Sequence, residues 1–83
     1  MVLIFVRIYG MKKEFDAKKF GDNLKSLRVE RHIGQNDLAR TLDLSNASIS
    51  YWENGKQEPS ASALFKLAQF FGVSVDYLIG LED

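Results

Sequence analysis

Apolar residues recur every three or four positions through most of the chain, which is the spacing of one face of an α-helix. The clearest run places Phe20 and Leu24 on one side of a segment that begins after Asp16. Asp16 can cap the start of this helix, and Phe15 can pack on Phe20 as a hydrophobic staple. We expect the helix to end within the sequence RHIG, near Gly34.

Four further segments show helical spacing, and each is bounded by residues that cap or stop helices. They therefore predict an all-α domain of five helices. The segments are 35–42 after the N-cap Gly34, 46–54 after Ser45 and before Gly55, a fourth between Pro59-Ser60 and Gly72, and a fifth between Ser74 and Gly80.

The first ten residues, MVLIFVRIYG, follow a different pattern, since they are β-branched and aromatic and end at Gly10. This composition is typical of a short strand. We therefore expect an N-terminal arm over residues 1–12, ahead of a helical domain over residues 13–83. An unpaired strand would expose backbone donors and acceptors. We expect residues 2–9 to pair with a second copy or to exchange onto it, the alternative being a passive tail ahead of Met11.

The segment LSNASISYWENGKQEP, residues 44–59, sets the only tryptophan of the chain among small polar residues. At 100° per residue, a helix over 46–54 has two distinct sides. Trp52 therefore faces the core, and a polar surface faces outward. The inward side carries Ser48, Ile49, Trp52 and Glu53, and the outward side carries Ala47, Ser50, Tyr51 and Asn54, with Asn46 at the edge.

The helices expected at 35–42 and 46–54 are separated only by Asp43, Leu44 and Ser45. This is helix-turn-helix spacing, in which the second helix lies in the DNA major groove. Amides and hydroxyls on the outward side can pair with base edges, and Ala47 can contact a thymine methyl group. On the spacing alone, an ordinary surface turn between two core helices remains the alternative.

The segment from Gln35 to Gly80 resembles the Cro/phage-repressor type of helix-turn-helix domain, also called XRE-like. The similarity covers roughly residues 20 to 80 and implies a lambda-repressor-like fold and a DNA-binding regulator. The matching positions are Gln35, Leu38-Ala39, Ile49, Trp52-Glu53, Gly55, Pro59, Leu67-Ala68 and the sequence VSVDYLIG.

The resemblance also implies roles for individual residues. It implies that Arg28 pairs with Glu53 behind the recognition helix, and that Asp43 stands where the family usually has a left-handed glycine. Tyr51 either reaches DNA or packs against the loop around Lys56. We expect base reading by Asn46, Ala47, Ser50 and Tyr51, and phosphate binding by Gln35, Asn54 and Lys56.

Composition changes this interpretation only slightly. Eleven basic and eleven acidic residues give a formal net charge of zero, although DNA affinity draws heavily on phosphate neutralisation. A second class of function therefore stays open, a protein-interaction module of the same fold such as an antitoxin or an adaptor. Its partner would be a toxin or another regulator.

Several other classes are disfavoured. The chain has no cysteine and one histidine, His32, so we expect neither a metal site nor a cofactor. No nucleophile, base and orienting group fall into a catalytic pattern, so we do not expect an enzyme. The apolar run VLIFV is too short to span a membrane, and we expect a soluble cytoplasmic protein.

The function that these observations favour is a sequence-specific DNA-binding transcriptional regulator. We expect a repressor that binds double-stranded DNA at a palindromic operator as a homodimer.

Overall fold

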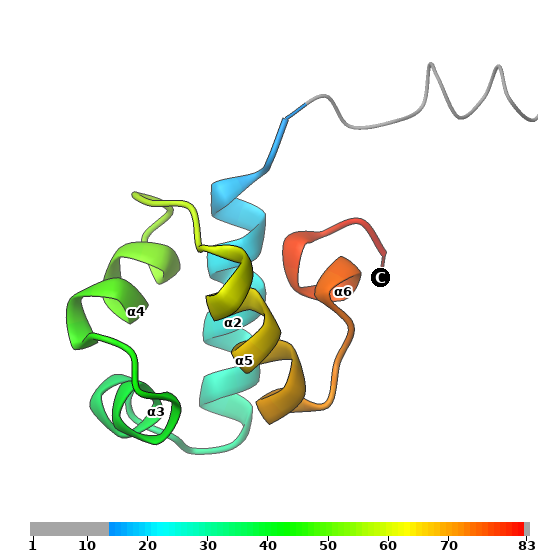
Figure 1. Cartoon of the computed structure of the whole chain (residues 1–83). Helices are drawn as coiled ribbons and strands as arrows, with labels where there is room; N and C mark the ends of the chain where they lie inside the picture. Colours follow the sequence, from blue (N-terminus) through cyan, green and yellow to red (C-terminus); the bar gives the residue numbers. More distant parts are fainter. Residues whose placement is uncertain (1–13, 83) are drawn as a thin grey trace, which may run out of the picture.

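The computed structural model describes residues 14–82, and within them the chain forms five helices and no strand (Figure 1). The expected five-helix, all-α domain is thereby confirmed. The strand and arm expected in residues 1–12 lie outside the described residues. The helices are α2 (Ala17–Glu30), α3 (Gln35–Leu42), α4 (Asn46–Glu53), α5 (Ala61–Phe71) and α6 (Val75–Ile79).

The five helices begin directly after the capping residues identified in the sequence. In four of them the cap side chain accepts a hydrogen bond from a backbone N–H three residues further on, which satisfies an otherwise unpaired donor. Gly34 precedes α3 without such a bond. The four caps are Asp16, Ser45, Ser60 and Ser74.

Each helix ends in a Schellman motif, in which the chain turns through a left-handed residue. Glycine takes the left-handed position after α4, α5 and α6, but His32 (φ 58°) and Asp43 (φ 56°) take it after α2 and α3. Asp43 therefore adopts the geometry that the family resemblance implied. The end expected near Gly34 was wrong by several residues, because α2 stops at Glu30 and His32, not a glycine, makes the turn.

The core lies between all five helices, and each of them contributes at least one of its largest fully buried side chains. Trp52 is only 5% exposed, and its ring packs edge-on to Phe20 at 6.2 Å between centroids. The rings of Phe15 and Phe20 lie 5.9 Å apart between centroids, which confirms the hydrophobic staple. The fully buried side chains are Phe20, Leu24, Leu38, Ile49, Leu67 and Leu78.

Side chains of α2 also bind the ends of distant helices. The Asn23 amide donates to the carbonyls of Tyr77 and Leu78 at 3.0 and 3.2 Å, at the end of α6. At the C-terminal cap of α2, the Arg31 guanidinium donates to the last carbonyls of α5 at 3.1 and 2.8 Å. These bonds satisfy helix carbonyls that lack a partner within their own helix. Across residues 14–82, no helix combines the length and apolar character needed to cross a bilayer.

Candidate nucleic-acid interface

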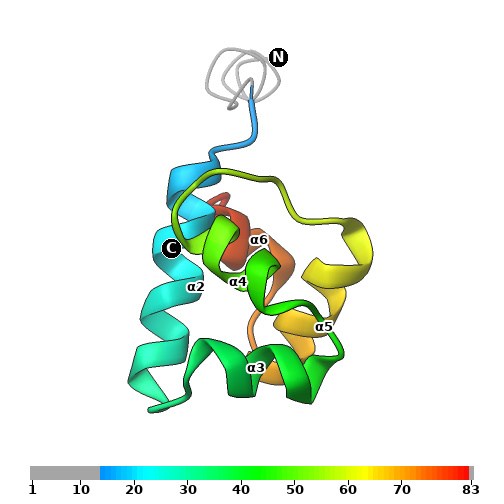
Figure 2. The same cartoon turned by 90° about the vertical axis from the view of Figure 1, so that its left-hand side faces the viewer.

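Helices α3 and α4 form a helix-turn-helix, and they lie against each other on one side of the molecule (Figure 2). The turn consists of Asp43, Leu44 and the cap Ser45, as the spacing predicted. The left-handed Asp43 lets the Leu44 N–H return to the carbonyl of Ala39 at 2.8 Å. Leu44 packs on the core, so the turn is held from inside and α4 has a defined orientation.

The two sides of α4 are separated as the sequence predicted. Ile49 and Trp52 are buried, whereas the outward side is exposed over most of its length. Tyr51 is 44% exposed, which makes it one of the few large hydrophobic side chains open to solvent among residues 14–82. Asn46, Ala47, Tyr51 and Asn54 are exposed, and Ser50 is half-buried beside them.

Glu53 holds the inner side of α4 to two other helices. Its carboxylate accepts hydrogen bonds from Arg28 Nε at 2.6 Å and Arg28 Nη2 at 2.9 Å, the paired geometry that strengthens a guanidinium–carboxylate contact. It accepts a third from Gln35 Nε2 at 3.1 Å. The Arg28 side chain is 13% exposed and that of Glu53 is 3% exposed, so the expected pair is present and largely buried.

The guanidinium of Arg28 also ties down the turn between α2 and α3. Its Nη1 donates to the carbonyl of Ile33 at 2.8 Å. The hydrogen bond to Glu53 raises the pKa of Arg28 further above its already high value. The guanidinium therefore stays charged at any ordinary pH, and its hydrogen bonds, with that from Gln35 to Glu53, lock α2, α3 and α4 together behind the outward face.

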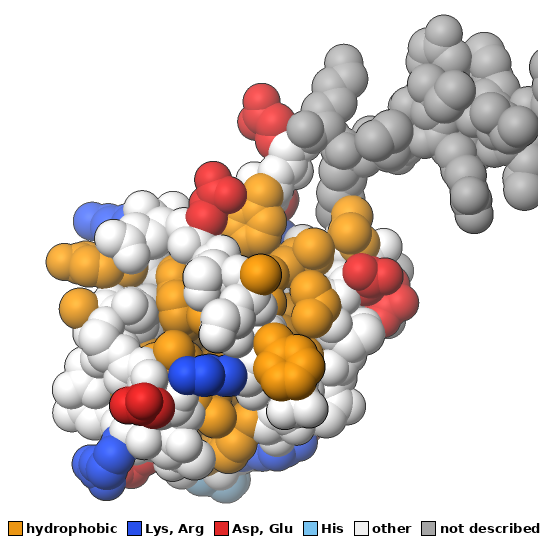
Figure 3. All heavy atoms as spheres, in the orientation of Figure 1, with side chains coloured by type: hydrophobic (Ala, Val, Ile, Leu, Met, Phe, Trp, Pro, Cys, Tyr) orange, Lys and Arg blue, Asp and Glu red, His pale blue; other side chains and the backbone are white. Residues whose placement is uncertain are grey.

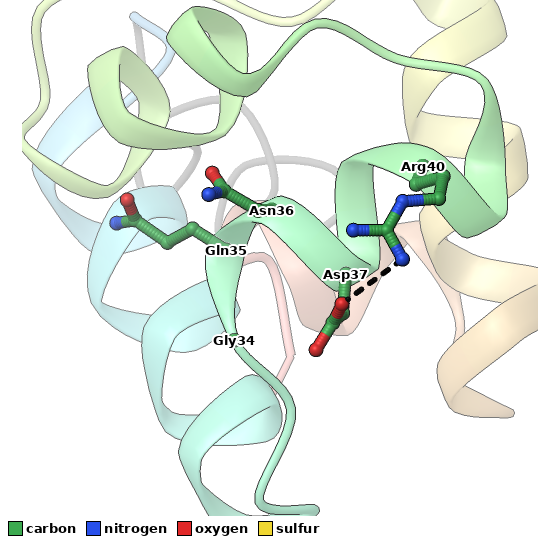
Figure 4. A pocket seen from close by; sticks show the side chains of 5 residues that line it. All are labelled: Gly34, Gln35, Asn36, Asp37 and Arg40. Atoms are coloured by element: carbon green, nitrogen blue, oxygen red, sulfur yellow. Dashed lines mark ion pairs between the residues drawn. The ribbon is translucent and has the colours of Figure 1, made fainter.

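The N-terminus of α3 forms an open hollow at the edge of the helix-turn-helix (Figure 4). Gln35 and Asn36 extend from one side of it, while Asp37 and Arg40 form an exposed ion pair at 3.3 Å on the other. Gly34 contributes no side-chain cap, so the positive end of the helix dipole is available to an anion. One hydrogen of the Gln35 amide nitrogen binds Glu53, which leaves the second for another acceptor.

The far end of α4 holds the other two residues expected to bind phosphates. The Asn54 amide nitrogen donates to the carbonyl of Ser50 at 2.9 Å and to the Ser50 hydroxyl at 3.4 Å, so both of its hydrogens are engaged and the side chain must rotate to meet an outside acceptor. Lys56 is exposed, and its N–H closes the Schellman motif on Tyr51 at 2.8 Å. The equivalent position after the other four helices is apolar, namely Ile33, Leu44, Val73 and Leu81.

Gly21 is a residue of this region that the sequence analysis missed. It lies inside α2, and a Cβ placed on it would sit 2.2 Å from the carbonyl oxygen of Trp52. Only glycine therefore lets α2 approach the backbone of α4 so closely. The available signal was a glycine in the interior of a helix, where it costs stability unless packing requires it.

A hydroxyl pair at the start of α4 was also missed. The oxygens of Ser45 and Ser48 lie 2.7 Å apart, and Ser45 also accepts the N–H of Ser48 at 3.1 Å. The signal was the pair of serines at the N-cap and three residues later. Their hydroxyls add polar groups next to Asn46 at the exposed end of α4.

Proteins similar in sequence are named as helix-turn-helix regulators. The chain is 39% identical over 62 residues to an uncharacterised HTH-type transcriptional regulator of Methanocaldococcus jannaschii, covering 75% of this chain and 94% of that protein. It is 35% identical over 65 residues to the HTH-type transcriptional activator BcrR of Enterococcus faecalis, covering 78% of this chain and 32% of the activator. The chain thus spans nearly the whole of the first relative but about a third of the second.

Solved structures show the same architecture. The restriction-modification controller protein C.AhdI of Aeromonas hydrophila superimposes with a TM-score of 0.70 at 28% identity, covering 76% of this chain and 96% of that one. The LexA repressor of Eubacterium rectale gives 0.75 at 26% identity, covering 88% and 76%. The helix-turn-helix family model HTH_3 matches residues 24–78, which confirms the XRE-like resemblance. The chain therefore belongs to the HTH_3 family of helix-turn-helix proteins.

Proposed function

We propose that the protein is a sequence-specific DNA-binding transcriptional regulator with α4 as its recognition helix. The observation that carries the proposal is the division of α4 into an exposed polar side and a buried side fixed by Trp52 and Glu53. A helix that reads bases needs its outward groups free and its orientation fixed. The relatives named as transcriptional regulators support the same function.

Base reading falls to the outward side of α4. The amide of Asn46 can pair with a base edge, most favourably adenine, and Ala47 can contact the methyl group of thymine. The hydroxyls of Ser50 and Tyr51 donate or accept hydrogen bonds with either partner of a base pair. This set lacks arginine and lysine, the commonest partners of guanine in the major groove, so the site favours A·T-containing positions.

Phosphate binding falls to the two ends of the motif. Gln35 offers its remaining amide hydrogen at the N-terminus of α3, where the helix dipole also favours an anion. Lys56 provides a charged contact beyond the other end of the recognition helix, assisted by Asn54 after rotation of its side chain. Contacts of this kind set the position of the protein on the duplex without reading its sequence.

The regulator acts as a repressor and binds a palindromic operator as a homodimer. A two-fold dimer places two recognition helices in successive major grooves, about 34 Å apart, which makes the operator palindromic. Repressors among the relatives, such as repressor protein C2 of Salmonella phage P22 at 32% identity, support this sign of regulation. The activator BcrR represents the opposite sign in the same family.

A protein-interaction module of the same fold is the second candidate. The observation in its favour is that α4 carries no basic residue, whereas non-specific DNA affinity depends on lysine and arginine. In that case the same outward face would bind a toxin or another regulator in place of DNA.

Selection from random duplex DNA separates the two candidates. We expect the purified protein to enrich a palindrome whose half-sites lie one helical turn apart. The double variant Asn46→Ala, Tyr51→Ala should lose that enrichment while keeping the fold. No enrichment by the unmodified protein, over a range of salt concentrations, would contradict the regulator and leave the interaction module.

A further inference from the structure

An apolar surface crosses α5 and α6 and reaches the start of α2 (Figure 3). Phe65 on α5 is 60% exposed and Leu81 after α6 is 57% exposed, the two highest values among the large hydrophobic side chains that the structure describes. Phe15 and Ile79 are partly buried beside the core. We call these four residues the α5–α6 face. We propose that residues 2–9 of a second copy of this chain cover it in the homodimer proposed above, on which this inference rests.

The chemistry of the two surfaces matches. The segment at residues 2–6 is VLIFV, and Ile8 continues it, so nearly every side chain is apolar. Each Å² of apolar surface removed from water on either partner contributes about 25 cal/mol. A face with two large exposed apolar side chains is the natural acceptor for such a segment, because exposed apolar patches of this kind mark interaction sites.

The N-terminal segment and the rest of the chain carry opposite net charge. The first thirteen residues contain Arg7, Lys12 and Lys13 and no acidic residue, which leaves eight basic and eleven acidic residues in 14–83. Exposed acidic residues, Asp76 and Glu82, lie in and just after α6. Acidic side chains are visible at the edge of the apolar surface in Figure 3. Arg7 within residues 2–9, and Lys12 and Lys13 just after them, can therefore meet acidic side chains around the face, which favours association and sets its direction.

The size of α6 indicates why a second copy needs this segment. Stable interfaces involve roughly 20–30 residues a side, whereas α6 contains five. Contact between two copies of α6 alone is therefore too small for a stable dimer. The described chain begins at Glu14, next to Phe15 of the α5–α6 face, and residues 10–14 can span about 17 Å when extended. Each arm can thus leave its own copy at the edge of the face and cross to the other copy.

A spin label tests the contact directly, since the chain has no native cysteine. A Leu3→Cys chain that carries a nitroxide, at natural nitrogen abundance, is mixed with a ¹⁵N-enriched chain that has no cysteine and no nitroxide. We expect loss of amide signal intensity around Phe65 and Leu81 of the ¹⁵N chain, and full intensity in α3. Because the label and the observed nuclei are on different chains, only contact between copies gives this result.

Matched substitutions locate the contact. The double variant Phe65→Asp, Leu81→Asp in the ¹⁵N chain should retain signal intensity on α5 and α6, whereas Val29→Asp, which replaces a 52% exposed residue of α2, should lose intensity like the unmodified chain. All three sites are exposed, so the variants should fold. Contact within one copy is measured separately, with a ¹⁵N chain that carries its own nitroxide. An excess of chain with neither label keeps two labelled copies apart, so any loss of amide signal intensity then arises within one chain.

The outcomes separate this inference from the proposed function. Intensity loss only within the chain that bears the label would overturn exchange and identify the arm of the same copy as the occupant. A dimer by sedimentation without any loss on α5 and α6 would overturn the arm contact and leave the homodimer in place. A monomer at all concentrations, with and without operator DNA, would contradict the homodimer itself.

Discussion

The inner and outer sides of α4 are held in opposite ways. On the inner side, Trp52 is buried and Glu53 accepts three hydrogen bonds from α2 and α3. On the outer side, Ala47 and Tyr51 are exposed. The inner residues determine where the helix lies, and the outer residues determine what it meets. Stability and recognition are therefore assigned to different residues of one short helix, and substitutions on the two sides should have separable effects.

The largest expected effect comes from the inner side. Glu53→Ala leaves the guanidinium of Arg28, 13% exposed, without its partner, and loss of one member of a buried pair typically costs about 3–5 kcal/mol. We expect the free energy of unfolding, measured by urea denaturation, to fall by about this amount. The control is Asp22→Ala, which removes an exposed ion pair with Lys18 at 2.9 Å and should leave the midpoint nearly unchanged. Equal small losses for both would show that burial adds nothing.

Gly21→Ala tests the close contact between the backbones of α2 and α4. Helix propensity alone predicts a gain of about 1 kcal/mol, but the new Cβ would lie 2.2 Å from the Trp52 carbonyl oxygen, which no side-chain rotation relieves. Overpacking of this kind costs about 1–3 kcal/mol or more, so we expect a net loss in the free energy of unfolding. Gly34→Ala, with φ −73° and its nearest neighbour at 3.8 Å, should lose less. A stabilised Gly21→Ala variant would contradict the close approach.

Substitutions on the outer side should change recognition and spare stability. The double variant Asn46→Ala, Tyr51→Ala should relax discrimination by about 1–3 kcal/mol at each contacted base pair. Its free energy of unfolding should change by no more than about 0.5 kcal/mol per site, as for surface residues in general. Fluorescence anisotropy with a series of single-base operator variants measures the first quantity. Asn36→Ala on α3 should keep the original sequence preference, and an unaltered preference in the double variant would refute the base-reading role.

The smallest effect is expected at the end of α4. Lys56→Ala should weaken binding to all DNA sequences alike and reduce the slope of log affinity against log salt by about 1. Titrations at several salt concentrations, on operator and on unrelated DNA, measure this slope. Lys66→Ala on α5 removes the same charge away from α4 and should leave the slope as it is. A sequence-dependent loss at Lys56 would move this residue into the base-reading set.

The fold could be predicted largely because its signals are local. A capping side chain such as Ser45 or Ser74 acts within three residues, and apolar spacing marks the buried side of each helix. The end of α2 was misplaced because His32, with φ 58°, makes the left-handed turn for which glycine is the usual signal. Gly34 was the stronger signal for a helix end, but in the structure it precedes α3 as the N-cap.

The site was predictable as a surface and less so as a set of contacts. Helical spacing placed Tyr51 outward, and the resemblance supplied the Arg28–Glu53 pair. The bond from Gln35 to Glu53 and the clearance at Gly21 depend on how three helices approach one another in space. No local sequence pattern carries that information. The roles in DNA binding stay predictions.

Trp52 gives the protein an intrinsic fluorescent probe of one defined local environment. It is the only tryptophan in the chain, and its indole sits against Phe20 on the inner side of α4. Its emission should shift to the red when α2 and α4 separate, because the ring then enters water. Ligands on the outward side of α4 act at the opposite surface and should leave that emission wavelength almost constant. The fluorescence of this one residue therefore reports the integrity of the scaffold independently of whether the recognition surface is occupied.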